Sequence, residues 1–478
     1  MSSSRSINER YERCLAALKL RGQQHVLRWW PELQRTERDH LLGQIEGLPW
    51  DTLDAVIPTH VLAQPRSGPF TDLRPAAVYP RHPGPDLQKR YSEARELGSH
   101  VIRAGKVAAF TVAGGQGTRL GFAGPKGALM VTPVGGRSLF QLFAEMIHAA
   151  SRRYSVQVPW YIMTSPVNHA ETQAYFEGHS FFGLSREDVV FFPQGVLPAF
   201  DFQGRLLLAA KDELALSPDG HGGSLKALVT SGAIVDLRRR GIEQISYFQI
   251  DNPLVQPFDP LFLGLHVMTG SEMSTKVASK TDDLEKVGNV CLVEGRATVV
   301  EYSDFPAELA KSRELDGRRR FDSGNLAIHI LDAGFVERVV GHTVQMPYRR
   351  AEKIVPFVDD SGATCHPTSP NGVKLETFVF DVLPLARTPL VLEVDRAEEF
   401  SPVKNETGVD SLETAKRAQI ARGCRWLESA GVFVPRRADG SPDVEVVISP
   451  LFALDAKEVQ AKMEYVPPLR PGDALYLE

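Results

Sequence analysis

Short apolar runs in the first half of the chain predict buried β-strands. Four of them lie at residues 107–112, 159–165, 189–195 and 243–253, each followed or interrupted by glycine, proline or a small polar residue. Runs of this length that are rich in β-branched and aromatic side chains are typical of strands buried on both faces. The sequence therefore predicts at least four strands of a buried sheet.

Helical periodicity separates these runs. Leu139, Phe143, Met146 and Ala150 fall on one face at a period of about 3.6 residues, directly after Ser138, whose hydroxyl suits an N-cap. Further helices are predicted over residues 11–20, 169–177 and 411–430. Strands that alternate with helices indicate an α/β fold with a largely parallel sheet.

The same patterns divide the chain into three segments. Residues 1–100 predict a helical arm, which ends in a proline-punctuated connector at 64–85 where a helix cannot persist. Residues 101–385 carry the α/β pattern, and residues 386–478 predict a small α+β domain. Ligands of such a sheet bind beyond the carboxyl ends of its strands, so we expect the functional site there.

Composition excludes several classes of protein. The 478 residues include 54 Lys plus Arg and 59 Asp plus Glu, a net charge of −5 that lacks the basic footprint of a nucleic-acid-binding protein. The four cysteines are far apart and form neither a zinc-binding spacing nor a disulfide framework. No apolar run reaches the roughly 18 residues of a membrane span, and the N-terminus lacks the apolar core of a signal peptide. We therefore expect a cytoplasmic protein with no nucleic-acid or membrane partner.

A glycine-rich loop at residues 112–127 directly follows the first predicted strand. Gly114, Gly115 and Gly117 would let the backbone approach an anion, because successive N–H groups form a phosphate-sized nest. The loop lacks the Gly-Lys-Ser/Thr of a Walker A motif, and Leu120 occupies the place of the third glycine of a dinucleotide fingerprint. Its glycines alone would also suit a tight turn before a helix.

Charged residues near the predicted carboxyl edge favour phosphate chemistry over a simple turn. Arg119 and Lys126 lie in the glycine loop itself. Asp251 ends an apolar strand, and a carboxylate is a hard ligand suited to Mg²⁺ or Mn²⁺ held together with substrate phosphates. An aspartate before Asn-Pro also commonly caps a turn. Asp381 and Asp395 are only candidates for a second carboxylate.

The loop resembles the signature of a known family, the eukaryotic-type UDP-sugar pyrophosphorylases, and among them the UDP-N-acetylglucosamine (UDP-N-acetylhexosamine) branch. The signature AGGxGTRLGxxxPKG is present at 113–127. Further segments that resemble the family follow in the same order: FFPQGVLPAFDFQGRLLL (191–208), SPDGHGGSLKAL (217–228), QIDNPLVQPFDPLFLG (249–264), KVGNVCLVEGRATVVEYSD (286–304), FDSGNLAIHIL (321–331), MPYRRAEKIVPFVD (346–359), KLETFVFDVL (374–383) and EEFSPVKN (398–405).

This resemblance implies both a fold and a reaction. The implied fold is a nucleotide-sugar transferase Rossmann-like core with a mixed, mostly parallel sheet, an N-terminal helical arm and a small C-terminal domain. The implied reaction joins UTP and N-acetylglucosamine 1-phosphate to give UDP-N-acetylglucosamine and pyrophosphate, with Mg²⁺ or Mn²⁺ as cofactor. Because a sugar phosphate oxygen attacks the α-phosphorus in line, the protein must supply positive charge and positioning.

Family motifs also imply a role for each matching residue. Arg119 would lie beside the β- and γ-phosphates, Lys126 beside the α-phosphate, and Lys404 on a late loop over the phosphates, so all three would act in catalysis. Asp251 would hold the metal and the nucleotide. The other nucleotide-binding residues implied by the match are Gly114, Gly115, Gly117, Gln194, Gly220 and His221. The implied sugar-binding residues are Glu301, Tyr302 and Asn325.

Two departures from the family pattern leave the sugar open. His221 stands where asparagine is familiar in the human-like acetylglucosamine enzymes, whereas histidine is typical of the glucose 1-phosphate relatives. In SGNLAIHIL the bulkier aromatic residues often seen after the asparagine are absent. The candidate substrates therefore include the 1-phosphates of N-acetylglucosamine, N-acetylgalactosamine, glucose and galactose.

Two other classes of protein are less favoured. A regulatory protein that binds nucleotide sugars without turnover would not need Arg119, Lys126, Asp251 and Lys404 together. A dinucleotide-dependent oxidoreductase would need the third glycine that Leu120 replaces.

Overall fold

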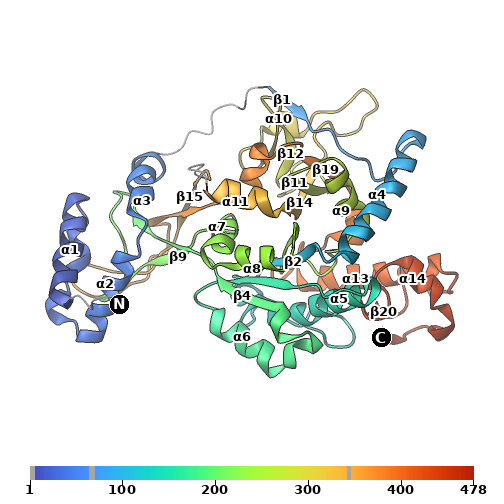
Figure 1. Ribbon diagram of the computed structural model, residues 1–478, viewed down its shortest axis with the longest axis horizontal. Coiled ribbons are helices and arrows are strands. Elements are labelled where there is room, and N and C mark those ends of the chain that lie inside the picture. The colour runs from blue at the N-terminus through green and yellow to red at the C-terminus, as the bar shows by residue number, and fades with distance from the viewer. Residues whose placement is uncertain (1–5, 64–69, 71, 342–345) are drawn as a thin grey trace. The chain divides into compact units, whose positions relative to one another are not determined.

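The computed structural model describes residues 6–63, 70, 72–341 and 346–478 (Figure 1). Part of the predicted connector, at 64–69 and 71, lies outside the described residues. Among the described residues, no helix has both the length and the apolar composition that crossing a membrane requires.

Packing divides the chain into two compact units, each assembled from segments that are distant in sequence. The smaller unit comprises residues 1–69, 194–224 and 345–381, and the larger comprises 70–193, 225–344 and 382–478. Each unit combines residues from more than one of the predicted segments 1–100, 101–385 and 386–478. The division of the chain into those three domains stays a prediction.

Half of the main sheet in the larger unit is parallel. β2 (Val107–Val112) lies between β10 (Gln244–Gln249) and β3 (Trp160–Thr164), and β4 (Val189–Pro193) pairs with β3. Nearly every residue of β2, β3 and β10 is buried, which explains why their sequences are continuous apolar runs. The four predicted strands are thus confirmed.

The other half of this sheet is antiparallel, so the sheet as a whole is mixed. β14 pairs antiparallel with β10, β11 and β12, while β11 also gains a parallel neighbour, β19. The strands of this half are β1 (Leu73–Pro75), β11 (Met273–Ser279), β12 (Asn289–Val293), β13 (Arg296–Val300), β14 (Ser323–Asp332) and β19 (Leu390–Glu393). A mixed sheet between helices confirms the α/β class, and its parallel part is the half that carries the glycine loop.

Helices of the larger unit supply its apolar core. Phe140 and Phe143 on α5 are fully buried with Trp160 and Phe248 of the sheet, and Ser138 caps α5 by accepting the Gln141 N–H at 3.2 Å. The helices are α4 (Pro85–Arg103), α5 (Leu139–Tyr154), α6 (His169–Gly178), α8 (Ala233–Arg239), α9 (Pro260–Met268), α10 (Ala307–Ala310), α11 (Ala333–Gly341), α12 (Arg396–Glu399), α13 (Leu412–Ser429) and α14 (Ala456–Ala461). The helices predicted after Ser138 and over 169–177 and 411–430 are confirmed.

The C-terminal part of the larger unit has an apolar core of its own. A parallel pair, β20 (Glu445–Ile448) and β21 (Ala474–Leu477), packs with α13 and α14. The hydroxyls of Ser449 and Tyr476 donate to the buried Glu145 carboxylate of α5 at 3.2 and 2.9 Å. These contacts join the end of the chain to the helix that follows the glycine loop.

The smaller unit packs the first helices of the chain on short strands around one shared core. Its helices are α1 (Ile7–Leu20), which was predicted, α2 (Arg35–Glu46) and α3 (Trp50–Val56). Its strands are β5 (Val196–Pro198), β6 (Phe200–Asp201), β7 (Leu208–Ala210), β8 (Glu213–Leu214), β9 (Leu216–Pro218), β15 (Arg349–Lys353), β16 (Phe357–Val358), β17 (Thr364–Cys365) and β18 (Gly372–Glu376). After β9 the chain enters α7 (Gly223–Thr230).

Candidate active site

The carboxyl ends of β2 and β10 lie side by side in the larger unit. Val112 pairs with Gln249 in the parallel register, and the Ile250 N–H donates to the Val112 carbonyl at 3.1 Å. The glycine loop therefore leaves the sheet beside Asp251. This confirms that the two strongest sequence signals meet at one edge of the sheet, where ligands of such sheets bind.

Short backbone contacts fix the shape of the glycine loop. The Lys126 N–H donates to the Gly115 carbonyl at 3.1 Å, and the Gly117 N–H donates to the Gly124 carbonyl at 2.9 Å. A Cβ on Gly117 would lie 2.6 Å from the Phe122 ring and 2.9 Å from its carbonyl oxygen, so only glycine fits there. A Cβ on Gly115 would meet no atom within 4 Å, which leaves that face of the loop open to a ligand.

Asn168 is hydrogen-bonded to the backbone of the glycine loop, and the sequence analysis did not predict this contact. Its buried side-chain amide donates to the carbonyls of Ala113 at 3.0 Å and Gly115 at 3.3 Å. Asn168 lies just after β3, whose carboxyl end is adjacent to that of β2. The sequence signal that could have identified Asn168 is its place as a polar residue four positions after β3, the buried strand that pairs with β2.

Lys126 and Asp251 face each other with little exposure. The Lys126 ammonium lies 3.8 Å from an Asp251 carboxylate oxygen, and the two side chains are only 18% and 11% exposed. The same ammonium donates to the Val403 carbonyl at 3.3 Å, while the Val403 N–H donates to the Asp251 carbonyl at 2.8 Å. A cation and a carboxylate are thus held together at the loop edge, where screening by water is reduced.

Residues 399–404 lie against the end of β10. Asn252 accepts the Ser401 N–H at 3.1 Å and donates its side-chain amide to the Glu399 carbonyl at 2.7 Å. This segment ends in Lys404, whose exposed ammonium lies 5.7 Å from the centre of the Phe400 ring.

A pocket of about 320 Å³ brings three predicted residues together. Asp251, Asn325 and Lys404 all line it, although they are far apart in sequence. Arg119 is exposed in the glycine loop, and among the described residues it has no hydrogen-bond or ion-pair partner. Positive charge is therefore available near this edge without a fixed protein partner.

The orientation of Asn325 is set by its neighbours. Its side-chain oxygen accepts the Ala327 N–H at 3.2 Å and the Thr275 hydroxyl at 3.1 Å. Because a backbone N–H can only donate, the oxygen of the amide must face Ala327, and the NH₂ group remains for a ligand acceptor. Thr275 is fully buried and was not predicted.

Glu301 and Tyr302 follow β13, near the strand that carries Asn325. A Cβ on Gly288 would lie 2.9 Å from a Glu301 carboxylate oxygen, and the Gly288 carbonyl accepts the Asn325 N–H at 2.8 Å. The Tyr302 side chain is 48% exposed. Gly288 thus places Glu301 close to Asn325, whereas within the described part of the chain no hydrogen bond joins the Tyr302 side chain to either residue.

The remaining predicted residues, Gln194, Gly220 and His221, belong to the smaller unit. Gln194 is buried directly after β4, and Gly220 has a φ of +84°. A Cβ on Gly220 would lie 2.4 Å from the Thr377 carbonyl oxygen, so this turn requires glycine.

A backbone hydrogen bond selects one tautomer of the neutral His221 ring. Its Nδ1 accepts the Val379 N–H at 3.2 Å, which leaves the proton of a neutral ring on Nε2. The ring stacks on Phe378 with centres 5.0 Å apart and planes at 14°.

Both candidates for a second metal-binding carboxylate have contacts of their own. Asp381 pairs with Arg349 at 2.7 Å in the smaller unit, and Asp395 caps α12 through the Ala397 N–H at 3.0 Å. Among the described residues, no group of three or more His, Cys, Asp or Glu side chains could hold a metal ion.

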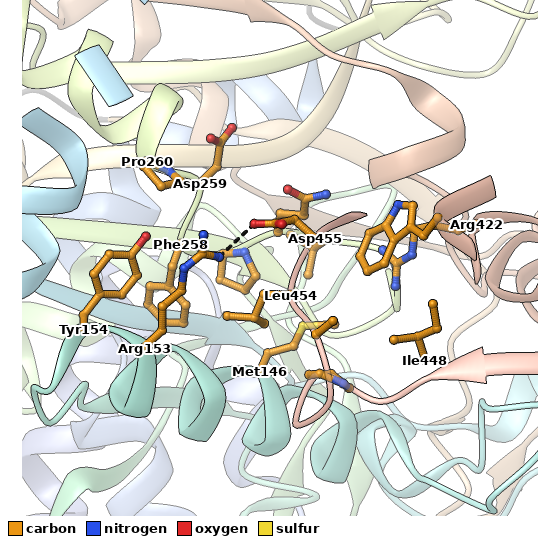
Figure 2. Close-up of a pocket in the computed structure, with 16 residues that line it drawn as sticks. Met146, Arg153, Tyr154, Phe258, Asp259, Pro260, Arg422, Ile448, Leu454 and Asp455 are labelled. Carbon is orange, nitrogen blue, oxygen red and sulfur yellow. Dashed lines mark hydrogen bonds and ion pairs between the residues drawn. The ribbon is translucent and has the colours of Figure 1, made fainter. Parts of the chain in front are cut away.

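A second pocket in the larger unit, of about 630 Å³, contains none of the predicted residues (Figure 2). We call it the C-terminal pocket, because α13, β20 and the following residues form one of its walls. It is lined by Met146, Phe258, Leu454 and other apolar side chains. Figure 2 shows its ion pair between Arg153 and Asp455, at 2.9 Å.

Comparisons with known proteins agree with this geometry. The family model described as UTP--glucose-1-phosphate uridylyltransferase matches residues 81–447. UDP-N-acetylhexosamine pyrophosphorylase-like protein 1 of Xenopus tropicalis is 38% identical over 473 residues, covering 93% of this chain and 92% of the relative. UDP-N-acetylglucosamine pyrophosphorylase of Saccharomyces cerevisiae is 36% identical over 433 residues, covering 86% and 90%.

A solved structure extends the similarity to the whole fold. The uridine diphosphate N-acetylglucosamine pyrophosphorylase from Trypanosoma brucei, in complex with an inhibitor, is 25% identical. It matches with a TM-score of 0.82 over 100% of this chain and 99% of that chain. By sequence, by fold and by the order of its motifs, the chain belongs to the UTP--glucose-1-phosphate uridylyltransferase family.

Proposed function

We propose that this protein transfers the uridylyl group of UTP to N-acetylglucosamine 1-phosphate and releases pyrophosphate. Membership of the family makes the chain a UDP-sugar pyrophosphorylase, a nucleotidyltransferase. The single observation that carries the proposal is the pocket where Asp251, Asn325 and Lys404 meet, with Lys126 at its edge. The relatives named for N-acetylglucosamine favour that sugar.

The chemistry needs charge and alignment rather than a protein nucleophile. A phosphate oxygen of the sugar 1-phosphate attacks the α-phosphorus of UTP, a new P–O bond forms, and the bond to the leaving pyrophosphate breaks. Both reactants are polyanions. Cations placed where charge develops lower the barrier, because they stabilise the transition state more than the ground state.

We assign the charge-stabilising roles to three cations. Lys126 is partly buried and fixed by the Val403 carbonyl, so it suits the α-phosphate, where position matters most. Arg119 is exposed and free of protein partners among the described residues, so it is available to the departing pyrophosphate. Lys404 ends the segment that borders the pocket, where it would meet the phosphate of the sugar.

Asp251 fits a Mg²⁺ or Mn²⁺ ion only in company with the substrates. It offers one carboxylate, and hard divalent ions are commonly held by one or two carboxylates plus substrate phosphates. When bound, the ion would neutralise phosphate charge and align the phosphate oxygens. Two contacts within the chain position Asp251. The Val403 N–H donates to its backbone carbonyl, and the Lys126 ammonium lies 3.8 Å from its carboxylate.

The sugar would be read by neutral or singly charged groups. Asn325 offers an NH₂ donor, which suits the carbonyl of an N-acetyl group, and Glu301 accepts from hydroxyls. We propose that Gln194, Gly220 and His221 contact the nucleotide. We propose that UTP and the sugar 1-phosphate are its partners and that the protein acts in the cytoplasm. The four free cysteines of the described chain agree with a reducing compartment.

Pyrophosphate release by the purified protein tests this function. The assay would supply UTP and Mg²⁺ with each of four sugar 1-phosphates in turn, those of N-acetylglucosamine, N-acetylgalactosamine, glucose and galactose, with EDTA as a control. We expect the highest kcat/KM with N-acetylglucosamine 1-phosphate and loss of turnover in EDTA. A preference for glucose or galactose 1-phosphate would overturn the choice of sugar, and UTP binding without turnover would favour a regulatory role.

A further inference from the structure

Lys276 is a fully buried lysine outside the predicted site. It lies on β11 with 0% of its side chain exposed. Its ammonium donates to both carboxylate oxygens of Glu399 at 2.7 Å and lies 2.9 Å from the Asp259 carboxylate. The ammonium also lies 5.2 Å from the centre of the Phe262 ring.

Glu399 links this lysine to the predicted site. While its side chain contacts Lys276, its backbone carbonyl accepts the side-chain amide of Asn252 at 2.7 Å. Asn252 directly follows Asp251 and also accepts the Ser401 N–H. Glu399 contacts Lys276 through its side chain and Asn252 through its backbone. It therefore joins the buried ammonium to the end of β10.

The segment from Glu399 to Lys404 carries this link to the pocket. The Val403 N–H and carbonyl contact Asp251 and Lys126, and the next residue is Lys404. A shift of Glu399 would move this segment relative to both side chains. Because electrostatic stabilisation depends on fixed distances, a shift of about 1 Å is enough to cost a large part of the rate.

Stability alone explains Lys276 poorly. Burial of one ammonium between two carboxylates carries a desolvation cost, and apolar residues of similar volume are often at least as stable as a buried ion pair. The other partner, Asp259, caps α9 through the Leu261 N–H at 2.9 Å and lines the C-terminal pocket, where Figure 2 shows it next to Pro260. Only the Glu399 contact leads to the predicted site.

We infer that Lys276 is a positioning residue of the uridylyltransfer reaction, which acts by anchoring residues 399–404 so that Lys404 and Asp251 keep their places around the phosphates. This inference rests on the proposed function. It assigns no contact between Lys276 and a substrate.

A double-mutant cycle tests the inference through kcat. The variants are Lys276→Met, Lys404→Ala and the two combined, assayed with UTP, Mg²⁺ and N-acetylglucosamine 1-phosphate at saturation. We expect Lys276→Met to lower kcat by at least tenfold. The double variant should be at least about tenfold faster than independent losses would predict, because both changes act on one segment. Fully multiplicative losses, or an unchanged kcat in Lys276→Met, would overturn the inference.

Asp259→Asn is the matched control. It removes the charge of the other Lys276 partner, while asparagine still caps a helix well, so we expect kcat within about twofold of the wild type. Equal losses of kcat in Asp259→Asn and Lys276→Met would point to a general structural role and overturn the inference.

Glu399→Gln keeps the inference testable if Lys276→Met fails to fold. It retains the shape of the side chain and weakens only the anchoring contact, so we expect a severalfold lower kcat and the same non-additivity with Lys404→Ala. Independent losses in that pair would overturn the inference. Wild-type turnover is read first: an inactive wild type overturns the proposed function and this assignment with it, whereas an active wild type with an unaffected Glu399→Gln overturns this assignment alone.

Discussion

Two of the pockets in the larger unit, the C-terminal pocket and the pocket lined by Asp251, Asn325 and Lys404, differ in how their charges are used. In the C-terminal pocket the charged side chains already have protein partners: Arg153 pairs with Asp455, Asp259 with Lys276, and Arg422 donates to the Leu254 carbonyl at 2.9 Å. In the smaller pocket, by contrast, the exposed Lys404 ammonium lies 5.7 Å from the centre of the Phe400 ring.

Size alone is therefore a poor guide to which of these two pockets binds a phosphorylated ligand. The C-terminal pocket has about twice the volume, 630 against 320 Å³, yet the charged groups named above are compensated by protein. A ligand with several phosphates needs cations that are free to bind it. The smaller pocket is lined by the exposed Lys404, and the exposed Arg119 lies in the loop that leaves the sheet beside Asp251.

Loss of a loop cation should give the largest effect. We expect Lys126→Ala and Arg119→Ala each to lower kcat/KM by at least about a hundredfold, the scale of one charged transition-state contact. Steady-state pyrophosphate release with UTP and N-acetylglucosamine 1-phosphate measures this. Activity within severalfold of the wild type in either variant would remove that residue from the mechanism.

The buried carboxyl group between the two pockets should make stability depend on pH. Burial raises the pKa of Glu399 to about 7, against the opposing effect of Lys276, while Lys276 holds the pKa of Asp259 low. Arg422 also faces Glu399 and lowers its pKa. Glu399 therefore ionises less readily in the folded protein than in the unfolded chain, although its carboxylate accepts from Lys276.

The sign of this effect follows from proton binding. Between the unfolded pKa of Glu399, near 4.5, and its folded value, near 7, the folded state binds one more proton, so stability falls as pH rises. The contribution is complete below pH 4.5 and is lost above about pH 7, a change of roughly 3 kcal/mol. Urea unfolding of wild type and Glu399→Gln across this range isolates it, since other groups cancel in the difference. Parallel pH profiles for the two proteins would contradict this prediction.

His221→Asn tests whether sugar choice depends on residues outside the smaller pocket. We expect the ratio of kcat/KM for N-acetylglucosamine and glucose 1-phosphates to change by about tenfold, the scale of one altered hydrogen bond to a substrate. His221→Gln, which also offers an amide donor, serves as the control for loss of the Phe378 stack. An unchanged ratio in both variants would make His221 irrelevant to selectivity.

The smallest effect is expected in the C-terminal pocket. Arg153→Ala breaks a partly exposed ion pair with Asp455, which should cost about 1 kcal/mol or less of stability and change kcat/KM by less than twofold. Thermal unfolding and the pyrophosphate assay measure the two quantities. A loss of kcat/KM comparable to that of Lys126→Ala would show that the comparison between the pockets is wrong.

Sequence predicted those parts of the site that are local in the chain. Gly117 and Lys126 lie in one loop, and Asp251 ends a strand whose apolar run is unambiguous, so parallel pairing alone brought them to one edge. The parallel half of the sheet was predicted for the same reason. The family resemblance implied a mixed sheet, but the pairing of its antiparallel strands was not predicted, because the sequence of β14 does not reveal which strands become its neighbours.

The residues that support the site could not be predicted this way. Lysine is rarely buried, so Lys276 in the sequence of β11 suggests a solvent-facing position. Its burial depends on Glu399 and Asp259, which lie far from it in the chain. Thr275 and Asn168 were missed for the same reason, since each takes its meaning from a contact partner on another strand or loop. The roles assigned to the site residues, Gln194, Gly220 and Tyr302 among them, stay predictions.

Asn168 has a consequence for how the glycine loop responds to a ligand. Peptide groups in glycine-rich turns can rotate and exchange an outward N–H for an outward carbonyl. Here the Gly115 carbonyl accepts both the Asn168 amide and the Lys126 N–H, so a rotation would break two hydrogen bonds at once. The loop therefore keeps its polarity without a ligand, and dipoles that are already oriented cost no reorganisation when they meet developing charge.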